Sequence, residues 1–242
     1  ESFGCQVRLN LSQTILTMGI VNTNNIEETA SSIMTLTPRD KQNLKTFGYG
    51  VLAVLAGALI YLLCLAACFW QSRYGVESET AIEWVQDVVL LISMGSFYSL
   101  AKRIPEERGG ILLMAGFMTS LFIREQDAYF DFISKSAWQI VLAVFLVILF
   151  WRISKRGLSE TLEGVAHFVR SQSFVAMIAG LGMLLVYSRI YGSGHLWSLF
   201  ISEEGPKYIA KRLSEESTEL LGYALMTLSS ISYYVERLKL HR

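Results

Sequence analysis

Residues that build metal, redox and disulfide sites are scarce in this sequence. Among 242 residues there are three histidines, three cysteines and three prolines. Two of the cysteines, Cys64 and Cys68, lie four apart in an apolar stretch, a spacing typical of small core residues. No CxxC or HExxH motif is present, and no Gly-Lys-Ser follows the Gly192-Ser193-Gly194 turn. The sequence therefore indicates no disulfide framework and no phosphate-binding loop.

Charged residues are also scarce, and neither sign dominates. Asp, Glu, Lys and Arg make up 17% of the chain, and 21 basic against 21 acidic residues give a formal net charge of zero. Hydrophobic residues make up 52%, and the mean hydropathy is +0.39. This is more apolar than a water-soluble core of this length needs. The composition does not indicate a basic nucleic-acid-binding protein and predicts an integral membrane protein.

Apolar segments separated by polar loops predict an all-α bundle of about six transmembrane helices. The segments run from Thr46 to Trp70, Glu83 to Ala101, Gly109 to Ile123, Trp138 to Trp151, Ser171 to Tyr191 and Glu219 to Val235. A polar extramembrane arm, residues 1–45, precedes this transmembrane domain of residues 46–236, and a short basic tail, residues 237–242, follows it. Several segments are short for a full crossing, so we expect the helices to include their polar ends. Gly180, Gly182 and Gly222 predict close packing of the last two helices.

Basic residues alternate between the predicted loops and set the orientation. They lie before the first segment, between the second and third, between the fourth and fifth, and after the sixth: Arg39, Lys41, Lys45, Lys102, Arg103, Arg108, Arg152, Lys155, Arg156, Arg170, Arg237, Lys239 and Arg242. The opposite loops hold fewer bases near the membrane, although Lys207, Lys211 and Arg212 reduce the contrast. This pattern predicts that both termini are cytoplasmic.

This topology brings acidic residues from several segments together near the outer surface of the membrane. They are Glu83, Asp87, Glu125, Asp127, Asp131, Glu215, Glu216 and Glu219, with Arg124 among them and His195 in the loop after the fifth segment. On a continuous helix, Arg124, Asp127 and Asp131 share a narrow arc. Carboxylates near hydrocarbon are costly, so we expect them to be paired or to face a cavity.

The first interpretation of this acidic group is a collar of ion pairs that anchors helix ends. Arg124 is spaced to pair with Asp127 or Asp131, Lys211 with Glu215, and Arg212 with Glu216. Such a collar organises helices and performs no chemistry.

The second interpretation is a site for a divalent cation. Asp127, Asp131, Glu216 and Glu219 offer the oxygen ligands that calcium or magnesium prefers. Haem is not expected, because His167 and His195 lie on opposite sides of the membrane in this topology. His167 itself is predicted to be a surface histidine on an amphipathic cytoplasmic segment, Leu158 to Val169.

The third interpretation is catalysis or proton relay. Glu125, Asp127 and Glu219, together with His195, would then act as acid or base on a lipid headgroup or in a transport step. The inner halves of the third and fourth segments hold almost no polar residues, which argues against a transport path.

Two acidic motifs carry a resemblance to other proteins. They are Arg124-Glu125-Gln126-Asp127 with Asp131 and Trp138, and the run from Glu215 to Gly222. From the third to the sixth segment, the chain resembles uncharacterised bacterial polytopic inner-membrane proteins. The resemblance implies a location in the bacterial inner membrane and assigns no activity.

The prediction that follows is non-enzymatic: an integral membrane accessory or scaffold subunit of a larger membrane assembly. Its acidic cluster would organise helices, bind a cation or dock a partner. The expected partners are the lipid bilayer and other membrane protein subunits, and no nucleic acid. The alternatives are a membrane-embedded lipid-modifying or hydrolytic enzyme and a small transporter.

Overall fold

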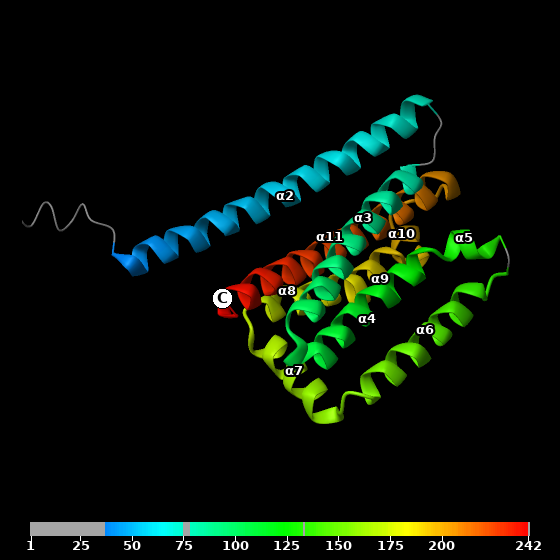
Figure 1. Cartoon of the computed structure of the whole chain (residues 1–242). Helices are drawn as coiled ribbons and strands as arrows, with labels where there is room; N and C mark the ends of the chain where they lie inside the picture. The colour runs from blue at the N-terminus through cyan, green and yellow to red at the C-terminus, as the bar shows by residue number, and fades with distance from the viewer. Residues whose placement is uncertain (1–36, 75–77, 133, 242) are drawn as a thin grey trace, which may run out of the picture. The chain divides into compact units, whose positions relative to one another are not determined.

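A computed structural model describes residues 37–74, 78–132 and 134–241, and these residues form helices and no strand. This confirms the all-α prediction. In chain order the elements are α2 (Pro38–Tyr74), α3 (Ser78–Arg103), η1 (Pro105–Glu107), α4 (Arg108–Glu125), α5 (Asp127–Asp131), α6 (Ala137–Ser154), α7 (Leu158–Arg170), α8 (Ser173–Gly182), η2 (Met183–Tyr187), α9 (Ser188–Tyr191), α10 (Gly194–Ser198) and α11 (Glu204–Leu240) (Figure 1). Most of the predicted polar arm lies outside the described residues.

The helix α2 contains the first predicted segment, Thr46 to Trp70. A reciprocal cap fixes its start: Asp40 N–H donates to Thr37 Oγ1 at 3.1 Å, and Thr37 N–H donates to Asp40 Oδ2 at 3.1 Å. The chain divides into two compact units at Leu55, within this helix.

Three helical segments of the described chain are long and apolar enough to cross a membrane by length and composition. They are Ile82–Arg103, Ala137–Ser154 and Ser173–Tyr191. The helix α4 carries three charged residues within its 18 residues, Arg108, Arg124 and Glu125, which lowers its apolar character. The helix α11 carries charged residues over its first half and buries Thr227, Ser229 and Ser230 further along, which lowers its apolar character. The structure thus supports membrane location, and a six-span topology remains a proposal.

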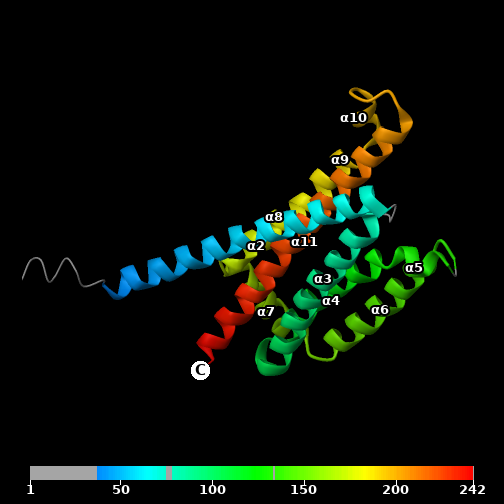
Figure 2. The same cartoon turned by 90° about the horizontal axis from the view of Figure 1, so that it is seen from above.

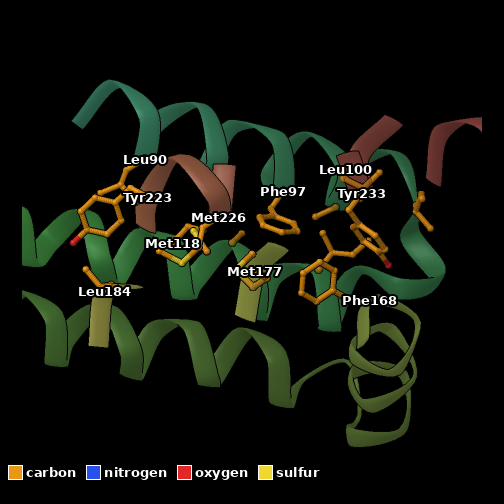
Figure 3. Packing of buried hydrophobic residues seen from close by; sticks show 14 residues of the cluster. Leu90, Phe97, Leu100, Met118, Phe168, Met177, Leu184, Tyr223, Met226 and Tyr233 are labelled. Atoms are coloured by element: carbon orange, nitrogen blue, oxygen red, sulfur yellow. The ribbon is translucent and has the colours of Figure 1, made fainter. Parts of the chain in front are cut away.

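The core of residues 78–241 lies where α3, α4, α7, α8 and α11 meet (Figures 1 and 2). Aromatic rings fill one end of it. The ring of Phe168 stands edge-on to Tyr233, with centroids 4.9 Å apart, and edge-on to Phe97, at 5.8 Å (Figure 3). Met118, Met177 and Met226 fill its middle.

Glycines bring two helix pairs into close contact. A Cβ on Gly180 of α8 would lie 2.6 Å from the carbonyl oxygen of Gly222 on α11, and this contact supports the predicted packing. A Cβ on Gly182 would meet no atom within 4 Å, so Gly182 does not bring the two helices together. A Cβ on Gly110 of α4 would lie 2.6 Å from the carbonyl carbon of Gly164 on α7.

The amphipathic segment predicted at Leu158 to Val169 is the helix α7. Thr161, Gly164 and Phe168 are buried on one of its faces, while Leu158 and Leu162 are exposed on another. Gly157 precedes the helix with a φ of 98°, a conformation that favours glycine. An apolar face left exposed beside the bundle is typical of a helix that lies in a membrane interface.

Candidate functional site

Charged side chains from α3, α4, α9 and α11 meet at one end of the bundle. We call them the carboxylate–arginine cluster: Glu83, Arg124, Glu125, Arg189, Arg212, Glu215, Glu216 and Glu219. The start of α3, the ends of α4 and α9, and the first half of α11 supply these residues. Alternating helix directions bring them to the same end (Figure 1).

Glu219 lies at the centre of the cluster and is 4% exposed. Its Oε1 accepts a hydrogen bond from Arg189 Nη2 of α9 and lies 3.5 Å from Arg124 Nη2 of α4. A single buried carboxylate on α11 therefore joins arginines from two other helices. Charge-assisted hydrogen bonds of this kind are stronger and more directional than neutral ones.

Arginine and glutamine side chains pair the two neighbouring carboxylates. Glu215 Oε1 lies 3.4 Å from Arg189 Nη1, and Glu216 Oε1 lies 3.3 Å from Arg212 Nη1. Gln86 of α3 donates from Nε2 to Glu216 Oε2 at 3.2 Å and to the Glu216 carbonyl at 3.1 Å. The amide thus links α3 to α11 through both the backbone and the side chain.

Glu125 is held by a tyrosine instead of an arginine. The buried hydroxyl of Tyr223 on α11 donates to Glu125 Oε1 at the end of α4. Burial raises the pKa of Glu125 from 4.5 to about 7, and the negative charge of the nearby Glu219 acts in the same direction. Burial and Glu219 likewise raise the pKa of Glu216 to about 7, against the lowering effect of Arg212. Both residues lie just outside the predicted spans.

The expected helix face of Arg124, Asp127 and Asp131 is interrupted. The helix α4 ends at Glu125, and Gln126 forms a turn after it. The side-chain Nε2 of Gln126 donates a hydrogen bond to Asp87 Oδ1 at 2.5 Å. The turn places Asp127 on the short helix α5, where its side chain is exposed, so a continuous arc was the wrong expectation. The side chain of Asp131 lies outside the described part of the structure.

Two further candidates lie apart from the central carboxylates. His195 is on α10 and exposed, and no described contact joins it to Glu125 or Glu219. Lys211 is half-buried, but Glu215 pairs with Arg189 instead. Of the pairs expected from spacing, the structure contains Arg212 with Glu216. Spacing along one helix was a poor guide to partners that come from other helices.

Within the described residues, no group of three or more His, Cys, Asp or Glu is arranged to hold a metal ion. Arginines interleave with the carboxylates, and each pairing uses a lone pair that a cation would need. The cation interpretation of Asp127, Asp131, Glu216 and Glu219 thus gains no support from the described contacts.

A second buried carboxylate lies at the opposite end of the bundle, and the sequence did not point to it. Glu107 of η1 is 5% exposed, and its Oε1 lies 2.6 Å from His167 Nδ1 and accepts a hydrogen bond from Arg237. His167 was expected to be a surface residue, but α7 packs against η1 and buries part of its ring. The sequence feature that could have indicated this contact is the position of His167 on the amphipathic segment.

No family model, no curated protein and no solved structure matches the chain. The resemblance to bacterial inner-membrane proteins therefore stays a prediction.

Proposed function

We propose that this protein is a polytopic membrane scaffold or accessory subunit. In this proposal six helices cross the membrane, both termini are cytoplasmic, and the carboxylate–arginine cluster lies near the outer surface. The cluster fixes the helices relative to one another and so presents a rigid lipid-embedded body to other subunits. The resemblance described above favours the bacterial inner membrane as its location.

The observation that carries the proposal is the pairing of Glu219 with Arg124 and Arg189. These residues come from α11, α4 and α9, so one carboxylate cross-links three parts of the chain. A buried carboxylate that two arginines hold is restrained by them, because charge-assisted hydrogen bonds are strong and directional. It is well suited to fix helix register.

The test of the cluster is the substitution Glu219→Gln, with Asp127→Asn as the control on an exposed carboxylate of the same end. Loss of the central charge leaves Arg124 and Arg189 without their shared partner. We expect Glu219→Gln to lower the thermal unfolding midpoint in detergent by several degrees, and Asp127→Asn to leave it unchanged. An unchanged midpoint for both variants would contradict the scaffold role of the cluster.

The subunit role needs a separate measurement. In membranes solubilised with a mild detergent, the chain is expected to migrate on a native gel as an assembly larger than its own 27.2 kDa. Migration as a single chain with bound detergent and lipid would contradict this part of the proposal.

A proton-handling function, as an enzyme or a small transporter, is the second candidate. The observation that favours it is Glu125, a half-buried carboxyl that accepts a hydrogen bond from Tyr223 and whose pKa is raised to about 7. Under this candidate, Glu125→Gln keeps the fold and removes the activity. Under the scaffold proposal, the same substitution affects stability alone.

A further inference from the structure

The end of the bundle that holds Lys102, Arg108 and Arg152, here called the basic end, contains a pocket that the proposed function does not use. Its volume is about 950 Å³, and it lies between the end of α3, the start of α4 and the last turns of α6. The residues that line it are Tyr98, Ala101, Lys102, Arg108, Leu112, Phe145, Ile148, Leu149, Trp151, Arg152, Lys155, Arg156 and Glu160.

The charges in this pocket are strongly unbalanced. Five lining residues are basic, and Glu160 is the one acidic residue among them. Glu160 is already engaged, because its Oε1 accepts a hydrogen bond from Gly109 N–H at 3.1 Å and lies 3.8 Å from Arg156 Nη1. The pairing leaves Lys102, Arg108, Arg152 and Lys155 without a carboxylate inside the pocket.

Two of these bases are held in place by groups that do not neutralise them. Arg108 donates from Nε to the Ala101 carbonyl at 2.8 Å, which fixes the guanidinium while both Nη nitrogens stay clear of that bond. The ammonium of Lys155 lies 3.7 Å from the centroid of the Trp151 ring. The cations are therefore positioned before any ligand arrives, which reduces the entropy lost on binding.

The opposite wall of the pocket is apolar. Leu112 of α4 and Phe145, Ile148 and Leu149 of α6 form it. Leu149 also lines a neighbouring pocket of about 390 Å³ whose lining is almost entirely apolar. Apolar surface thus continues from the basic residues toward the middle of α4 and α6, and Trp151 and Tyr98 lie at the boundary, as aromatic residues do in membrane interfaces.

We propose that this pocket binds an anionic phospholipid from the leaflet at the basic end. Lys102, Arg108, Arg152 and Lys155 contact the phosphate, and the acyl chains lie along the apolar wall between α4 and α6. Cationic pockets between transmembrane helices on the cytoplasmic side have the chemistry that such headgroups require. A soluble phosphate would use the cations alone and leave the apolar wall without a function.

The experiment is native mass spectrometry of the purified full chain in detergent, titrated with cardiolipin, phosphatidylglycerol or phosphatidylcholine. We expect both anionic lipids to bind at least about tenfold more tightly than phosphatidylcholine. Arg152→Gln and Lys102→Gln should each weaken the binding of anionic lipid roughly fivefold, and the double variant roughly 25-fold. Neither side chain has a described bond to another residue, so both variants should keep the wild-type unfolding midpoint.

The matched control is Arg170→Gln, which removes an exposed base at the end of α7 that does not line the pocket. It should leave the affinity unchanged. The proposal is overturned if phosphatidylcholine binds as tightly as the anionic lipids, or if Arg170→Gln weakens binding as much as Arg152→Gln. It is also overturned if inorganic phosphate displaces the lipid at equal concentration, because the ligand is then a soluble anion.

Discussion

His167 Nδ1 lies 2.6 Å from Oε1 of Glu107, and the same carboxylate accepts a hydrogen bond from Arg237. The contact ties the helix α7 and the end of α11 to the turn between α3 and α4. Arg237 is mostly buried, with 12% of its side chain exposed. Glu107 therefore has a structural role at its end of the bundle that resembles the role of Glu219 at the other.

Glu107→Gln should destabilise the protein, because it leaves the charge of Arg237 buried without a counter-charge. Breaking a buried pair in this way costs about 3 kcal/mol. For a chain of this size that lowers the thermal midpoint by roughly 6–12 °C. The control is Glu106→Gln, since Glu106 is exposed in the same turn. Equal midpoints for the two variants would show that the buried pair contributes nothing.

Gly180→Ala should separate α8 from α11, because its new Cβ would lie 2.6 Å from the carbonyl oxygen of Gly222. Backbone atoms cannot yield as a flexible side chain does, so overpacking here costs about 1–3 kcal/mol. Gly182→Ala is the matched control, with no atom within 4 Å of its added methyl. In a helix that control should be neutral or slightly stabilising. Thermal unfolding in detergent gives the midpoints of the two variants. A midpoint for Gly180→Ala at or above that of Gly182→Ala would refute the close contact.

Tyr223→Phe tests the hydrogen bond between α11 and the end of α4. The substitution keeps the buried ring but removes the donor to Glu125, which costs about 1–3 kcal/mol for a buried partner left unsatisfied. Tyr187→Phe removes an exposed hydroxyl and should change nothing. Chemical denaturation monitored by tryptophan fluorescence compares the two variants. An equal loss of stability in the two variants would mean that the hydrogen bond to Glu125 does not stabilise the fold.

The stability of the protein should decrease as the pH rises from about 4.5 to 7. Burial raises the pKa of Glu216 from 4.5 to about 7, so the folded state binds this proton more tightly than the unfolded chain does. The stabilisation is complete below the unfolded pKa and is lost as the pH approaches the folded one. Glu216→Gln should therefore reduce the pH dependence of the unfolding midpoint between pH 5 and 8, and the part due to Glu125, whose pKa is raised in the same direction, should remain.

Glu204→Gln is the control for the pH experiment, because Glu204 is an exposed carboxylate on the same helix. It should keep the full pH dependence of the wild type. A wild-type midpoint that rises over this pH range would contradict the raised pKa of Glu216.

Apolar runs predicted the positions of the helices well, because a long run of apolar residues without helix-breaking residues is typical of a helix. The segment predicted from Trp138 to Trp151 is the helix Ala137–Ser154. The segment predicted from Ser171 to Tyr191 is the helical stretch Ser173–Tyr191, which includes a π-helical turn. The prediction for α11 was short at both ends. Its first 15 residues are mostly polar and charged, and they resemble a loop when hydropathy alone is considered.

The partners in the candidate site could not be predicted from the sequence in the same way. Spacing along a helix favours neighbours three or four residues away, and this rule gave Arg212 with Glu216. Arg124 instead pairs with Glu219, and Gln86 with Glu216, across about a hundred residues or more. Such pairs depend on the rotation of each helix about its own axis, which apolar periodicity fixes poorly when all faces of a helix are apolar.

The π-helical turn η2, Met183–Tyr187, accommodates one more residue than an α-helical turn between Gly180 and Arg189. If the same residues wound as a regular α-helix, everything after the turn would be rotated by about 100°. Arg189 would then point away from Glu215 and Glu219 while Gly180 still faced Gly222. The turn thus sets the angle between two contacts on one helix.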